Sequence, residues 1–139
     1  MSNDATQPIR RTCVVGAGTI GSLFAGHFGS VATSTVLTRR AEHADRLNAE
    51  GLRVSGKSDI HSDIVASTDP AELGEVDLVV IATKATAVEA SARALQGHFP
   101  GATVMTVQNG LGCEDVVARY GAWPVISSVT FMSGRRHGD

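Results

Sequence analysis

A glycine-rich turn placed between a strand and a helix constrains this chain more than any other feature. The β-branched run Arg11–Val15 predicts a strand, and apolar residues three and four apart from Thr19 to Phe28 predict a helix ending at Gly29. Between them stands the pattern G-x-G-x-x-G, which in this strand–turn–helix setting is typical of dinucleotide binding. The candidate pyrophosphate-binding residues are Gly16, Ala17, Gly18, Thr19, Ile20 and Gly21.

Each glycine of this turn has its own physical reason. Gly16 permits the tight turn, Gly18 removes a side chain that would block a pyrophosphate, and Gly21 lets the helix and the strand pack closely. The phosphates would then meet free N–H groups and the positive end of the helix. The alternative is a structural glycine turn that binds no ligand.

Strands and helices alternate along the rest of the chain. Further strands are predicted at Thr35–Thr38, Asp77–Thr83, Thr103–Val107 and Val125–Phe131, and helices at Ala41–Glu50, from the capping box Thr86–Glu89 to Phe99, and at Glu114–Tyr120. The apolar centre of Asp77–Thr83 is typical of a strand covered on both faces. This alternation predicts an α/β fold of the Rossmann type: a doubly wound, mostly parallel sheet with helices on both faces.

Two shorter features are expected between these elements. Leu52–Ser55 and Ile60–Val65 predict a hairpin, and Asp69 followed by proline predicts a brief helix. A length of 139 residues suits one domain. We expect that domain at residues 8–139, behind a disordered polar tail at residues 1–7.

Composition excludes several classes of function. A net charge of −2 gives no broad positive field for nucleic acid or for a membrane surface, and no segment resembles a signal peptide or a membrane span. The two cysteines lie far apart without C-x-x-C spacing, which favours a reducing cytoplasm. The five histidines lack metal-ligand spacing, so no metal site is expected.

The end of the second strand predicts which dinucleotide binds. Domains that bind NAD generally carry an acid there for the ribose 2′-hydroxyl. This chain has Thr38 and Arg39, followed by Arg40, and no acidic residue between Asp4 and Glu42. A hydroxyl and a guanidinium suit a 2′-phosphate, so NADP is favoured over NAD. The alternative is a solvated arginine pair before a helix.

Two further side chains are expected at the same edge of the sheet. Lys84 follows the central strand, and Gln108-Asn109-Gly110 follows the next one. The ammonium would stand beside the cofactor, and an amide can donate and accept near the nicotinamide ribose or a substrate oxygen. A surface lysine and a turn asparagine are the structural alternatives.

Four motifs together resemble the N-terminal half of the ketopantoate reductase (2-dehydropantoate 2-reductase) family. They are Val15–Gly21, Leu37–Arg39, Ala82–Ala85 and Val107–Gly112. The resemblance implies that the glycine turn binds the NADP pyrophosphate and that Arg39 binds the 2′-phosphate. It also implies that Lys84 and Asn109 contact the cofactor and a small-molecule 2-keto acid.

The resemblance therefore implies an NADPH-dependent oxidoreductase of pantothenate biosynthesis that reduces a branched 2-keto acid to the 2-hydroxy acid. Family members continue into a helical domain with the lysine that donates the proton, so we expect this chain to be a fragment with little turnover. Loss of that domain would uncover apolar surface and favour homo-oligomers. The alternative function is a stand-alone NAD(P)-sensing module without catalysis.

Overall fold

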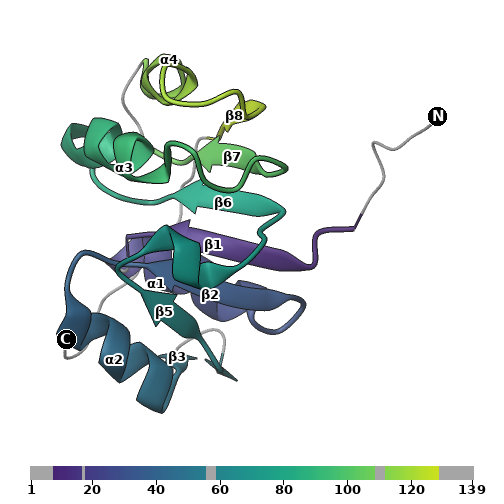
Figure 1. Cartoon of the computed structure of the whole chain (residues 1–139). Coiled ribbons are helices and arrows are strands. Elements are labelled where there is room, and N and C mark those ends of the chain that lie inside the picture. The colour runs from purple at the N-terminus through teal and green to yellow at the C-terminus, as the bar shows by residue number, and fades with distance from the viewer. Residues whose placement is uncertain (1–7, 17, 56–58, 109–111, 129–139) are drawn as a thin grey trace.

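The computed structural model describes residues 8–16, 18–55, 59–108 and 112–128. The predicted tail, Ala17, Asn109 and the end of the last predicted strand lie outside these residues. Six strands form one parallel sheet in the order β5-β2-β1-β6-β7-β8 (Figure 1). They are β1 Arg11–Val15, β2 Thr33–Leu37, β5 Val65–Ser67, β6 Leu78–Ile81, β7 Thr103–Thr106 and β8 Val125–Ser127.

The strand order confirms the predicted fold class. The chain starts in the middle of the sheet, builds outward through β2 to β5, then returns to β6 on the other side of β1. Counted by the strands of this sheet alone, this is the 3-2-1-4-5-6 order of Rossmann domains. The order reverses between β1 and β6, and folds of this type bind ligands in the crevice at the carboxyl ends of the strands at this point.

Helices cover both faces of the sheet. The α-helices are α1 Thr19–Phe28, α2 Ala41–Glu50, α3 Val88–Leu95 and α4 Cys113–Ala118, with the short 3₁₀ turns η2 Pro70–Leu73 and η3 Ala85–Ala87. In β1 the side chain of Val14 packs in one core cluster with Ala25 of α1, whereas Val15 packs in the other with Leu95 of α3. Coverage of both faces also explains why β6, the neighbour of β1, is apolar at every position.

The predicted hairpin exists, but its second strand was placed wrongly. β3 Leu52–Val54 pairs antiparallel with β4 Ile60–Ser62, and Val65 begins β5 in the main sheet. Asn48 of α2 stabilises this edge strand, because its side-chain amide bonds both the N–H and the C=O of Ala66 at 2.8 Å. A partner on a helix leaves no signature in the sequence of the strand, so β5 was missed.

The predicted capping box at Thr86–Glu89 is also wrong. The 3₁₀ turn η3 precedes α3, whose N-cap is Ala87 with no side-chain cap hydrogen bond. Glu89 instead accepts a hydrogen bond of 2.7 Å from the Tyr120 hydroxyl. The predicted cap at Asp69 is confirmed, since its carboxylate accepts from the N–H of Ala71 at 3.0 Å.

The buried thiol of Cys13 on β1 makes stability depend on pH. Burial raises its pKa to about 12, although hydrogen bonds involving Thr35 and Leu37 act in the opposite direction. An unfolded cysteine titrates near pH 8.5. Above that pH the unfolded state binds fewer protons than the folded state, so the free energy of unfolding falls as pH rises toward 12.

We expect this fall to reach about 1.4 kcal/mol per pH unit from Cys13 alone. Urea unfolding between pH 8 and 11 should therefore show a steeper loss for the unaltered chain than for Cys13→Ala. The lost packing of the thiol lowers stability equally at every pH, so only the slope reports the titration. Parallel curves for the two proteins would contradict this prediction.

Candidate functional site

The carboxyl ends of four adjacent strands bring the predicted site residues to one edge of the sheet. β2, β1, β6 and β7 are neighbours and parallel, and they are followed by Arg39, Gly16, Lys84 and Gln108 respectively. Segments up to 92 residues apart in sequence thus end side by side. Asn109 would follow at the same edge but lies outside the described residues.

The three glycines of the turn meet different surroundings. Gly16 has a φ of +93°, a backbone angle that residues with a side chain rarely adopt. Its N–H donates to the Leu37 carbonyl at 3.0 Å. A Cβ placed on Gly21 would lie 1.9 Å from the Gly16 oxygen. A Cβ on Gly18 would meet nothing within 4 Å. The chain itself therefore requires Gly16 and Gly21, whereas the space beside Gly18 is left open.

The start of α1 suits an anion. Its N-cap is Gly18, which provides no side-chain cap, and its first turn holds no acid. Among the four α-helices of the described part, α2, α3 and α4 each carry an acid in the first turn, and α1 alone does not. The first N–H groups of a helix lack partners inside the helix, and its dipole favours negative charge there. A pyrophosphate fits this combination of open space and free donors.

Two arginines follow β2 at the neighbouring position. Arg39 and Arg40 are exposed, and no hydrogen bond or ion pair joins either guanidinium to another described residue. The half-buried Thr38 is held by its N–H, which donates to the Ser67 carbonyl at 3.1 Å. Cationic groups are therefore available at the end of this strand.

An acidic side chain from a distant part of the chain is bonded to the strand that pairs with β2. Ser67 lies opposite Leu37, and its hydroxyl donates to the carboxylate of Glu72. Glu72 is 33 residues from Arg39 in sequence, yet its carboxylate is hydrogen-bonded to β5, the strand next to β2. An acid this far away along the chain cannot be recognised from the residues around Arg39.

The segment after β6 closes the other side of the turn. β6 ends at Ile81, so Lys84 stands three residues beyond the strand, exposed and at the N-cap of η3. The methyl group of Thr83 lies against the turn, because a Cβ on Gly16 would be 2.8 Å from it. The Gln108 amide nitrogen donates to the carbonyls of Ile81 and Thr83, both at 2.7 Å.

Comparison with known proteins identifies the family. The family described as ketopantoate reductase PanE/ApbA matches residues 12–139. The chain belongs to this family. The resemblance predicted from its four motifs is thereby confirmed.

Relatives of this ketopantoate reductase family chain are longer than it is. The 2-dehydropantoate 2-reductase of Halobacterium salinarum is 39% identical over 114 residues, which cover 79% of this chain and 37% of the relative. A PanE/ApbA family ketopantoate reductase from Ralstonia eutropha has a TM-score of 0.79 at 26% identity, over 92% of this chain and 46% of that one. A 2-dehydropantoate 2-reductase from Geobacter metallireducens has a TM-score of 0.75 at 30% identity, over 92% and 44%.

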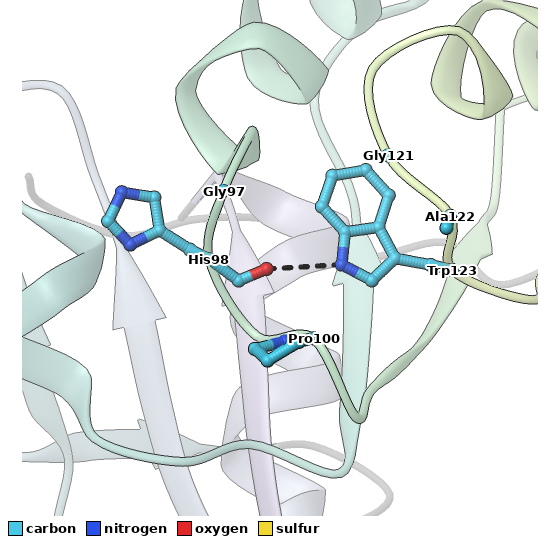
Figure 2. A pocket seen from close by; sticks show the side chains of 6 residues that line it. All are labelled: Gly97, His98, Pro100, Gly121, Ala122 and Trp123. Atoms are coloured by element: carbon cyan, nitrogen blue, oxygen red, sulfur yellow. Dashed lines mark hydrogen bonds between the residues drawn. The ribbon is translucent and has the colours of Figure 1, made fainter.

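A hollow elsewhere on the ketopantoate reductase family chain does not belong to this site. Figure 2 shows it between Gly97, His98 and Pro100 on one side and Gly121, Ala122 and Trp123 on the other. These segments precede β7 and β8, so the hollow lies at the amino ends of the strands, across the sheet from the glycine turn. The Trp123 ring nitrogen donates to the carbonyls of His98 and Phe99 at 3.1 and 3.0 Å, which closes this edge of the core.

Among the described residues, no group of three or more His, Cys, Asp or Glu side chains lies close enough to hold a metal ion. No helix within the described ranges has the length and apolar character needed to cross a bilayer.

Proposed function

We propose that this chain is the NADPH-binding part of an oxidoreductase of the 2-dehydropantoate 2-reductase type, which reduces a branched 2-keto acid. The observation that carries the proposal is the open, acid-free start of α1 at Gly18, next to the cationic end of β2. The first gives space and donors for a pyrophosphate, and the second gives charge for a 2′-phosphate. The substrate in this proposal, a branched 2-keto acid, is taken from the relatives, which are 2-dehydropantoate 2-reductases.

Each predicted site residue has a role in this proposal. Gly16, Ala17, Gly18, Thr19, Ile20 and Gly21 form the pyrophosphate turn, Thr38 and Arg39 bind the 2′-phosphate, and Lys84 and Asn109 contact the nicotinamide half and the keto acid. When bound, NADPH supplies the hydride. The Lys84 ammonium orients the carboxylate of the keto acid by charge and is not the group that protonates the new hydroxyl.

The proposal extends to domain organisation and surroundings. Residues 8–139 would be the cofactor domain of a protein as long as its relatives, of which this chain spans about a third. We place such an enzyme in the cytoplasm. Self-association stays a prediction, and the edge strand β8, where Ile126 is 51% exposed, offers apolar surface for it.

Titration of the 139-residue chain with both reduced coenzymes tests the proposal. We expect NADPH to bind at least about tenfold more tightly than NADH, because charge-assisted hydrogen bonds to a phosphate contribute about 1.5–3 kcal/mol. Fluorescence of the reduced nicotinamide reports binding of both. With 2-dehydropantoate added, the chain alone should oxidise little NADPH. Tighter binding of NADH, or no binding of either coenzyme, would contradict the proposal.

A further inference from the structure

The side chain of Gln108 makes hydrogen bonds to β6 and the residues after it that are normally made by the main chain of a neighbouring strand. Its Nε2 carries two hydrogens, and both are used: one points to the carbonyl of Ile81 and one to that of Thr83, each at 2.7 Å. These two carbonyls lie two residues apart, on the side of β6 that faces β7. The amide thus stands where a further N–H of β7 would stand in the parallel ladder.

The two hydrogen bonds also determine which way the amide points. If it were reversed, its oxygen would face two carbonyl oxygens, which cannot donate. Gln108 Oε1 therefore points away from β6, and it is buried without a donor among the described residues. A buried acceptor without a partner lowers stability, so such a group calls for an explanation other than stability.

The segment held by this amide lies beside the glycine turn. Between the two carbonyls, the N–H of Ala82 donates to the Val15 carbonyl of β1 at 2.9 Å. The end of β6 is therefore held from both sides, by β1 through the main chain and by β7 through Gln108. Thr83 then lies against the glycine turn at Gly16, and the next residue is Lys84.

We propose that Gln108 is a positioning residue: its amide prolongs the pairing of β6 with β7 beyond the ends of both strands, and so holds Thr83 and Lys84 where the nicotinamide half of NADPH binds. This inference rests on the proposed function. The Nε2 of Gln108 is not available to a ligand, because both of its hydrogens are bound within the chain.

Two ligands separate positioning from general damage to the fold. NADPH uses the whole crevice, whereas adenosine 2′,5′-bisphosphate lacks the nicotinamide half and reaches only the glycine turn and the end of β2. For Gln108→Met, which keeps the length of the side chain but cannot donate, we expect the Kd of NADPH to rise about tenfold, the loss of one or two neutral hydrogen bonds. The Kd of the bisphosphate should change less than about twofold.

Control variants make the result decisive. Gln96→Met is the same substitution at an exposed position at the far end of α3, and it should change neither Kd. Gln108→Glu keeps the shape of the side chain but turns a carboxylate toward the two carbonyls, so it should show the same split between ligands, even if Gln108→Met does not fold.

Two results would overturn the role of Gln108 while leaving the proposed function standing. One is an unchanged Kd of NADPH in both Gln108 variants, and the other is an equal loss of both ligands. Failure of the unaltered chain to bind NADPH would overturn the proposed function, and this inference with it.

Discussion

Arg39→Asp will weaken NADPH binding about 100-fold and change NADH binding by less than about threefold. The variant removes charge-assisted hydrogen bonds of about 1.5–3 kcal/mol and places a carboxylate against the 2′-phosphate, and each 1.4 kcal/mol is a tenfold change in Kd. NADH has only a hydroxyl at that position, which a carboxylate accepts well. Titrating both coenzymes into both proteins gives the four constants that are needed.

A matched control is available on β3. Arg53 is exposed there, and Arg53→Asp makes the same change of charge away from the end of β2. It should leave the Kd of NADPH nearly unchanged at physiological salt, because exposed charges are screened beyond about 8 Å. If Arg39→Asp weakened the two coenzymes equally, or if Arg53→Asp matched its effect, Arg39 would not contact a 2′-phosphate.

Gly18→Ala should weaken NADPH binding in a chain that folds normally. Gly18 has a φ of −75°, which alanine adopts readily. The Cβ of an alanine at this position would meet no protein atom within 4 Å. Stability should therefore stay within about 1 kcal/mol, with a small gain because alanine has less freedom in the unfolded chain. The same Cβ would occupy the space proposed for the pyrophosphate, so the Kd of NADPH should rise roughly tenfold or more, at least about 1.4 kcal/mol.

Gly21→Ala is the contrasting variant. Its Cβ would lie 1.9 Å from the Gly16 carbonyl oxygen, so the turn or the helix must move. Overpacking of this kind typically costs about 1–3 kcal/mol, and we expect Gly21→Ala to lower both the unfolding midpoint in urea and NADPH binding. Gly18→Ala with unaltered NADPH binding would show that the space beside Gly18 is not a phosphate site.

Elements whose cause is local were predicted closely. β1 and α2 have the predicted bounds, since a β-branched run and a helix period ending at Gly51 are both written in neighbouring residues. α1 also ends at Phe28, but Gly29 is needed for another reason than a left-handed cap. Its φ is −62°, and a Cβ there would lie 2.4 Å from the Cβ of Ser62 on β4.

The wrong predictions share one physical cause. β5 depends on pairing with β2 and on the Asn48 amide, and Glu89 is used by Tyr120 rather than as a cap. In both cases the deciding partner lies 18 to 31 residues away, and a local pattern cannot show whether such a partner competes for the group.

The sequence by itself determined the α/β class, the glycine turn and the cation at the end of β2, because each follows from residue types within a few positions. Only the tertiary structure decided which groups from different strands meet. Gln108 meets Ile81 and Thr83, and Ser67 lies opposite Leu37, because the order of strands in the sheet sets these contacts. That order results from burying both faces of the sheet at once, and no single segment carries that information.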